Sequence, residues 1–223
     1  DNVDFLEYAF DCNYGWTMHH YMNEIYSGEK NVNDIKSYFA QVDSTYPEGT
    51  YTLQFTSNHD ENSWNGTVYE RLGDAAQTFA VLSFTIPGMP LIYSGQETGL
   101  DKRLEFFEKD LIEWDSESEM TTFYTGLIDL KQENPALWNG AAGGWIEFLE
   151  TSAPDKLLAF QREKDDNTVL VIMNLSEQNL SGTFNLEQED EFLEFFTGNS
   201  AKLKTTNTIE LAPWEYLVYV KEL

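Results

Sequence analysis

The chain has 223 residues, of which 41% are hydrophobic, and 39 acidic against 13 basic residues give a formal net charge of −26. This length and composition allow one large domain or two smaller ones with a sizeable core. The charge excludes nucleic acid and anionic membrane surfaces as partners, because both are bound through basic patches, and no apolar run approaches the roughly 20 residues that span a bilayer.

The first 139 residues alternate between strand and helix patterns. Short strands are predicted at 9–13, 51–58 and 91–93, the last as a continuous apolar run of the kind found in buried parallel strands. Apolar residues recur with helical spacing between and after these strands. The predicted helices cover residues 17–28, 33–42, 72–86 and 118–133. This alternation is the βαβ pattern of a β/α barrel, in which chemistry takes place where strands end in loops.

The stretch 51–58 alternates between apolar and polar residues, so its two faces have different surroundings. Leu53 and Phe55 are expected to pack on the outer helices. Gln54, Thr56 and Asn58 are expected to point inward, toward a site at the end of the strand.

The pattern changes after residue 139, where a glycine-rich stretch at 140–144 marks a boundary. Short alternating segments with turn-forming residues between them then predict an antiparallel β-sandwich. The predicted strands are 145–149, 156–162, 168–175, 182–186, 191–196, 208–211 and 216–220. The chain is thus divided into a partial barrel at 1–139, with about three strands, and a β-sandwich at 140–223.

Several motifs resemble the α-amylase superfamily of glycoside hydrolases. FTSNHDEN at 55–62 resembles the end of that family's seventh barrel strand, and GMPLIYSGQETGL at 88–100 resembles its eighth-strand segment. AFDCNYGW at 9–16 resembles the sixth strand of bacterial amylases. LLAFQRE and TVLVIMNLS resemble the family's C-terminal β domain. The resemblance implies strands six to eight of a (β/α)8 barrel followed by that domain.

The resemblance also implies a retaining mechanism on starch or maltooligosaccharides, in which a carboxylate nucleophile and a carboxylic acid flank the scissile bond. By residue match, Asp60 is the third acid of the family, which stabilises the transition state, and His59 binds the same sugar ring. The motifs of the nucleophile and of the general acid are not found in the sequence and are expected before residue 1. These residues alone are therefore predicted to be inactive.

The residues themselves suggest further roles around Asp60. Asn58 shares a face with Asp60 on a regular strand, so it is expected to orient that carboxylate, with a bend or bulge at His59. Trp64, in the loop at 61–66, either stacks on a sugar or packs beneath the loop. Arg71 is expected to pair with an acid. His19 and His20 are not expected to hold a metal, because adjacent helical positions do not share a face.

Two alternatives to a hydrolase stay open: a non-catalytic glucan-binding or interaction module, and a transglycosylase or isomerase of the same superfamily. No cofactor is assigned, and calcium at the acidic runs 101–115 and 187–194 is the weaker alternative to solvated surface. The strands at both edges of a partial barrel need cover, either from the missing barrel half or from a homodimer. An extracellular or periplasmic location in a bacterium is expected.

Overall fold

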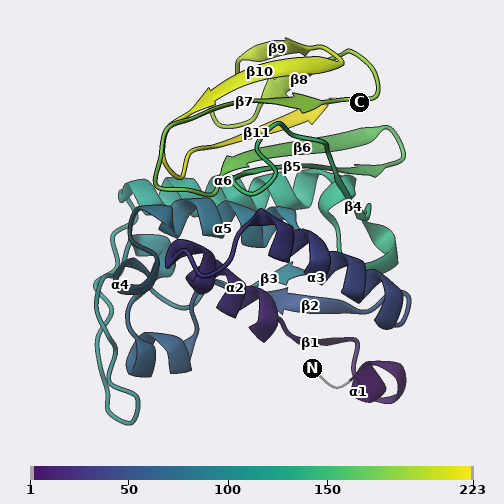
Figure 1. The fold of residues 1–223 in the computed structure, drawn as a ribbon. Helices are drawn as coiled ribbons and strands as arrows, with labels where there is room; N and C mark the ends of the chain where they lie inside the picture. The colour runs from purple at the N-terminus through teal and green to yellow at the C-terminus, as the bar shows by residue number, and fades with distance from the viewer. Residues whose placement is uncertain (1–2, 222–223) are drawn as a thin grey trace.

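A computed structural model describes residues 3–221 of the protein (Figure 1). Within these residues, a parallel sheet of three strands has the order β1-β2-β3, with helices in the crossovers. The strands are β1 (Cys12–Tyr14), β2 (Tyr51–Gln54) and β3 (Met89–Pro90). The α-helices are α1 (Val3–Tyr8), α2 (Trp16–Tyr26), α3 (Val32–Thr45), α4 (Val68–Leu72), α5 (Ala76–Thr85) and α6 (Glu119–Glu133). This is a segment of a β/α barrel, as predicted.

Antiparallel sheets follow α6 and confirm the predicted sandwich. In the described part of the chain, one sheet has six strands in the order β4-β5-β6-β11-β8-β9, and β10 pairs with β7 in a second sheet. The strands are β4 (Ile146–Phe148), β5 (Leu157–Lys164), β6 (Asn167–Asn174), β7 (Leu180–Asn185), β8 (Asp190–Glu194), β9 (Ser200–Leu203), β10 (Thr206–Leu211) and β11 (Tyr216–Lys221). The sequence pattern missed β9, in which Leu203 is the one buried residue.

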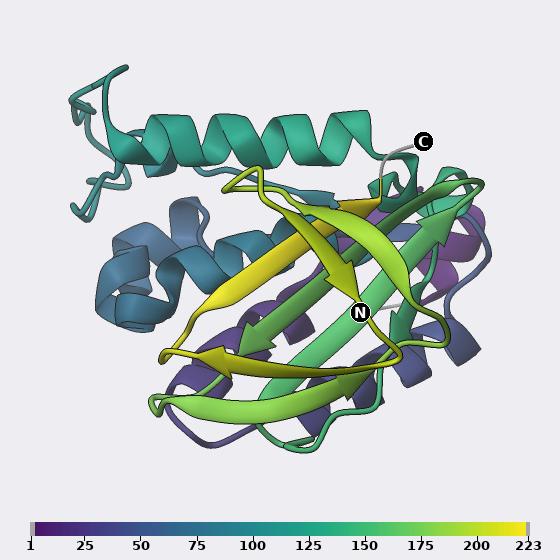
Figure 2. The same cartoon turned by 90° about the horizontal axis from the view of Figure 1, so that it is seen from above.

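The antiparallel sheets lie over α5 and α6, on the side of these helices that faces away from β1, β2 and β3 (Figure 1). Figure 2 shows α6 running beside the six-stranded sheet. One buried cluster joins the helices to that sheet, with Phe79 of α5 and Leu127 of α6 in the same core as Phe160 of β5. A second cluster lies between the two sheets and includes Ala159 and Phe184. Successive residues of β5 therefore enter different cores, as the alternation of a strand requires.

The third parallel strand is shifted from its predicted place at 91–93. The structure has β3 at Met89–Pro90, where Met89 pairs with Leu53 and Pro90 with Gln54. One further bond runs from the Leu91 N–H to the Gln54 carbonyl, at 2.8 Å. Strand β2 ends at Gln54, so the apolar residues that follow Leu91 have no strand beside them.

The helix predicted at 72–86 is interrupted near its start. Helix α4 ends at Leu72, and Gly73 adopts a left-handed φ of 46° before α5 begins at Ala76. A Cβ at Gly73 would lie 2.1 Å from the hydroxyl oxygen of Tyr26. The connection between α4 and α5 thus lies against Tyr26 of α2 so closely that a side chain at position 73 would not fit.

The polar face of β2 is buried. Thr52 and Gln54 are buried, whereas Leu53 is only half-buried. Gln54 donates from Nε2 to the Thr52 hydroxyl and to the Pro87 carbonyl. Two residues further on, the Thr56 hydroxyl accepts a hydrogen bond from Gln96. Most polar groups of this face are hydrogen-bonded, which hydrophobic patterning does not register, although the Gln54 Oε1 atom is buried without a partner among the described residues.

Candidate functional site

The predicted site lies where the chain leaves β2. The strand has already ended at Gln54, and a helical turn begins at His59 and leads into a single π-helical turn, Glu61–Asn65. Of the predicted bend or bulge at His59, the structure has the bend, because the chain leaves the strand direction and turns there. Single π-helical turns are frequent at functional sites, and this one follows directly after Asp60.

Asn58 caps this turn. Its Oδ1 atom accepts the backbone N–H groups of Asp60, at 3.0 Å, and Glu61, at 2.8 Å. An asparagine side chain that binds the backbone two and three residues ahead is a common device for starting a turn. The Asn58 side chain is buried, so it holds the main chain of Asp60 rather than its carboxylate.

His59 and Asp60 both point toward solvent. Their side chains are 60% and 48% exposed, and the His59 Nε2 atom lies 3.6 Å from Oδ2 of Asp60. The structure thus brings these two predicted residues together at an open surface. A ligand can reach the imidazole and the carboxylate at the same time.

A group of aromatic rings lies on one side of His59. The Phe106 ring lies 5.8 Å from the His59 ring and 5.2 Å from the Trp64 ring, between centroids. Phe107 packs against Phe106 at 4.8 Å. Trp64 is 57% exposed, so it packs beside Phe106 while leaving much of its surface open. We call Trp64, Phe106 and Phe107 the aromatic cluster; its position allows contact with a ligand at His59.

The π-helical turn fixes the loop that carries the two phenylalanines. Asn62 donates to the Lys102 carbonyl at 3.0 Å and accepts from the Leu104 N–H at 2.8 Å. The Ser63 hydroxyl donates to the Leu104 carbonyl at 2.7 Å. These bonds join segments about forty residues apart and bring the aromatic cluster to the same face as Asp60.

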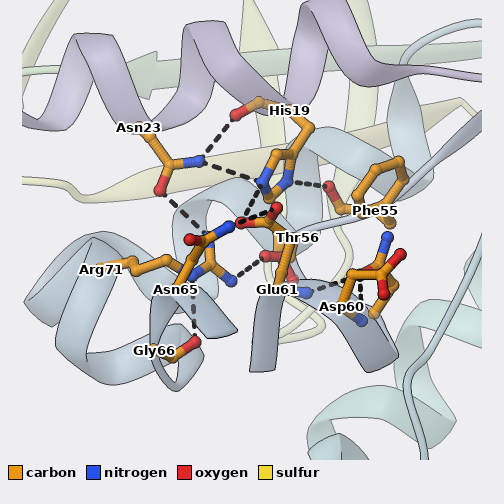
Figure 3. Close-up of polar contacts among 10 residues, drawn as sticks. His19, Asn23, Phe55, Thr56, Asp60, Glu61, Asn65, Gly66 and Arg71 are labelled. Carbon is orange, nitrogen blue, oxygen red and sulfur yellow. Dashed lines mark hydrogen bonds and ion pairs between the residues drawn. The ribbon is translucent and has the colours of Figure 1, made fainter. Parts of the chain in front are cut away.

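A buried pair lies behind Asp60 (Figure 3). His19 of α2 places Nε2 3.1 Å from Oε2 of Glu61, and Asn65 donates to the other Glu61 oxygen at 2.9 Å. Burial and the charge of Arg71 lower the pKa of His19, against the opposing pull of Glu61. Burial raises the pKa of Glu61, but His19 and Asn65 together hold it below its usual value. The site therefore rests on an ionised carboxylate directly after Asp60.

Arg71 joins the loop to α2, as Figure 3 shows. Its guanidinium donates to the Thr56 carbonyl at 2.7 Å, the Asn23 Oδ1 at 3.0 Å and the Gly66 carbonyl at 3.1 Å. The expected pairing of Arg71 with an acid is present only at longer range: its hydrogen bonds go to neutral oxygens, while the charges of Glu61 and Glu70 raise its pKa against burial. The planar fork of arginine suits such multiple recognition.

Sequence reasoning missed His19 and Glu61 as parts of the site. The only sequence signal for Glu61 was its position directly after Asp60. Its partner His19, on α2, is 42 positions earlier in the sequence. Within residues 3–221, no three His, Cys, Asp or Glu side chains come together in a way that could hold a metal ion. In the same range, no helix has both the length and the apolar character that crossing a bilayer requires.

Two family models match the sequence. The alpha amylase catalytic domain model matches residues 6–167. The model for the maltogenic amylase C-terminal domain matches residues 146–218. Together they cover almost the whole chain, and the first alone covers well over half of it.

Individual members of the family are also similar to this chain in sequence or in structure. Alpha-amylase MalA of Haloarcula japonica is 25% identical over 177 residues, which cover 78% of this chain and 26% of that protein. A cyclomaltodextrinase of Bacillus sp is 34% identical over 97 residues, which cover 42% of this chain and 17% of that protein. The solved structure of a maltogenic alpha-amylase, AmyB from Thermotoga neapolitana, has a TM-score of 0.82 at 18% identity and shares the fold over 98% of this chain and 52% of that chain. This chain thus spans about a quarter of MalA and about half of the AmyB structure.

Proposed function

The chain belongs to the α-amylase family, and on that premise we propose that it is the C-terminal part of a retaining α-glucan hydrolase. In this proposal Asp60 stabilises the transition state, and His59 and Trp64 contact the sugar. Asn58 contributes indirectly, by holding the backbone of Asp60. The observation that supports this assignment best is the shared exposure of His59 and Asp60 on a turn in which Asn58 and Glu61 are buried and paired.

The chemistry explains why an exposed carboxylate is useful here. Cleavage of a glycosidic bond builds positive charge at the anomeric carbon. An ionised Asp60 close to that carbon lowers the barrier electrostatically. The His59 imidazole can donate a hydrogen bond to a hydroxyl of the same sugar, and the Trp64 ring offers an apolar surface to the ring face.

Asp60 supplies only one of the carboxylates that the reaction needs. A retaining enzyme uses a nucleophile and an acid/base about 5–5.5 Å apart. Glu61 is the neighbouring candidate, but its oxygens are engaged by His19 and Asn65. The motifs that carry the nucleophile and the acid in this family are not found in the sequence. We therefore expect the 223 residues alone to bind glucan without cleaving it.

An activity and binding assay tests this proposal. The purified chain is incubated with starch and maltotriose, and released reducing ends are measured; none are expected above the level of a heat-inactivated sample. Maltotriose is then titrated into the chain and followed by the His59 ring signals in NMR spectra. We expect maltotriose to shift these signals in the native chain. The Asp60→Asn variant should bind maltotriose about tenfold more weakly, which is the loss expected when a hydrogen bond to a charged group is removed. Hydrolysis by the pure chain would contradict the proposal, and so would an Asp60→Asn variant that binds maltotriose as tightly as the native chain.

The edges of the parallel sheet support a second part of the proposal, that another segment or a second copy of the chain covers them. Within the described residues, β1 and β3 each pair on one side only, with β2. The neighbouring Phe5 and Phe10 side chains are exposed. Unpaired edges beside exposed apolar groups invite association. Light scattering measures the mass in solution, and a dimer is expected for the isolated chain. If the chain is a monomer, a second copy does not cover the sheet edges, and a further barrel segment becomes the proposed cover.

A further inference from the structure

A cavity of about 430 Å³ opens at the other end of the parallel sheet from Asp60. It lies between the end of α3, the turn that leads into β2 and the chain that enters the antiparallel sheets. Tyr51, the first residue of β2, lines it, whereas Asp60 follows the last residue of the same strand. The cavity is therefore separate from the proposed active site.

The cavity walls are rich in aromatic rings. Tyr38 and Phe39 of α3, Tyr46 and Tyr51 line one part, and Trp145 lines another. The Phe39 and Trp145 rings lie 6.1 Å apart in an edge-on arrangement. At the rim, a Cβ on Gly140 would lie 2.5 Å from the Gly49 carbonyl oxygen, so two distant segments meet closely there. The walls are thus held by tertiary contacts.

Two polar groups of the cavity lining have unused hydrogen-bonding capacity. The Tyr38 hydroxyl is buried and makes no hydrogen bond of ordinary geometry within the described residues, although the Thr52 side chain is close enough to lower the pKa of Tyr38 against burial. Arg162 donates from Nε to one carbonyl, from Nη1 to three and from Nη2 to that of Trp138 alone. A guanidinium carries two hydrogens on each terminal nitrogen, so one Nη2 hydrogen has no acceptor among residues 3–221. Buried groups of this kind favour a ligand that hydrogen-bonds to them.

The charges around the cavity select the ligand class. The buried Arg162 guanidinium disfavours a cation inside the cavity, whereas Asp43 and Glu48 on the lining disfavour an anion. A purely apolar ligand would leave the Tyr38 hydroxyl and the Arg162 hydrogen unpaired. A neutral molecule with several hydroxyl groups and apolar ring faces satisfies all three conditions.

We propose that this cavity is a second carbohydrate-binding site, which takes a neutral sugar of one or two rings. The sugar ring packs against the aromatic walls near Trp145. Its hydroxyl groups accept from Arg162 and pair with the Tyr38 hydroxyl. The volume falls within the range of about 300–1,000 Å³ that is usual for small-molecule sites. The proposal uses no residue of the Asp60 loop, so it stands whether or not that loop acts in catalysis.

The test is a maltose titration of the whole 223-residue chain, followed by the indole N–H signals of its 6 tryptophans. The Trp145→Ala variant identifies the Trp145 signal by its disappearance. We expect maltose to shift that signal in the native chain. The Tyr38→Phe variant, which loses only the hydroxyl, is expected to bind about fivefold more weakly. Trp114→Ala, which removes an exposed tryptophan outside the cavity lining, is the matched control and should leave the affinity unchanged.

Parallel titrations separate this site from the other one. Asp60→Asn should leave the maltose response of Trp145 intact, even if it abolishes binding near His59. Tetramethylammonium and inorganic phosphate serve as cationic and anionic probes and should leave the Trp145 signal in place. The proposal is overturned if maltose does not shift the Trp145 signal, if Tyr38→Phe binds as tightly as the native chain, or if a charged probe binds in preference to maltose.

Discussion

The His19 Nε2 atom lies 3.1 Å from Oε2 of Glu61, while Nδ1 of the same ring lies 3.3 Å from the Phe55 carbonyl oxygen. Both ring nitrogens thus face oxygen acceptors. A neutral imidazole donates from one nitrogen only, and the charged ring donates from both. Glu61 favours the charged ring, but burial and the charge of Arg71 outweigh it, so the pKa of His19 lies below its usual value. Glu61 is therefore the group whose charge limits the fall in the pKa of His19.

Replacing Glu61 with glutamine tests this relationship. The Glu61→Gln variant loses the negative charge that raises the pKa of His19, so that pKa is expected to fall further. Loss of the charged hydrogen bond should lower the free energy of unfolding by about 2 kcal/mol. Imidazole NMR titration and urea unfolding measure the two effects. Glu117→Gln, at an exposed position, is the control; a His19 pKa that is the same in both variants would contradict the assignment.

Lys131 gives the protein a specific pH dependence. Burial, followed by the charge of Arg162, lowers the pKa of Lys131 to about 6, whereas an unfolded lysine holds its proton until about pH 10. Between these values the unfolded chain binds more protons, so this residue makes stability rise with pH, by up to about 1.4 kcal/mol per unit. Lys131→Met removes that contribution.

Urea unfolding of the native chain and of Lys131→Met at several pH values between 7 and 9 measures this contribution. The difference in unfolding free energy should shift in favour of the native chain as pH rises. Lys204→Met, which changes an exposed lysine, should give a curve parallel to that of the native chain. Parallel curves for Lys131→Met as well would show that Lys131 keeps its ordinary pKa in the folded protein.

Arg162 of β5 connects the antiparallel sheet to the barrel segment. Its guanidinium is buried and donates to the carbonyls of Thr85 and Ile86, at the end of α5, and to those of Leu137, Trp138 and Gly144. Arg162→Met leaves these carbonyls without their donors, and a loss of about 3 kcal/mol or more in unfolding free energy is expected. Arg162→Lys should recover only part of it, because an ammonium cannot reproduce the planar fork.

Thermal and urea unfolding measure the Arg162 variants. Lys164→Met is the matched control, since Lys164 lies two residues further along β5 and donates to the Ala141 carbonyl from an exposed position. Its effect should stay within about 0.5 kcal/mol. Equal losses for Arg162→Met and Lys164→Met would show that the buried contacts add nothing.

Trp64 is expected to act on binding and not on stability. Its side chain is largely exposed beside Phe106, so Trp64→Ala should change the unfolding free energy by less than about 0.5 kcal/mol. Loss of its ring surface should weaken maltotriose binding near Asp60 about fivefold. NMR titration through the His59 signals measures this affinity, with Trp114→Ala as the control. If Trp64→Ala binds maltotriose as tightly as the native chain, Trp64 only packs against the loop and does not contact the sugar.

Local sequence signals predicted most of the fold. Apolar spacing located α2, α3 and α6, and alternation located most strands of the sandwich. The errors occurred where tertiary contacts decide: β3 is limited by the early end of β2, and β9 buries only Leu203. The polar face of β2 lies inside because Gln54 and Thr56 find specific partners. A hydrophobic pattern does not contain that information.

The site was predictable only in its exposed part. His59 and Asp60 are adjacent in sequence and belong to a recognisable motif. The supporting contacts reach to α2 and to the loop after β3, and nothing local points to them. His19, Asn62 and Arg71 act through contacts that span about fifteen to forty residues. The boundary at residues 139 and 140 and the extracellular or periplasmic location stay predictions.

The buried cluster that joins α5 and α6 to the six-stranded sheet has a consequence for folding. Phe79 and Leu127 belong to the same core as Phe160 and Val171, so neither the helices nor the sheet can keep a dry interior when the other is removed. The described chain should therefore melt in a single cooperative transition. In recombination between relatives, the sheet would remain stable only if α5 and α6 moved with it.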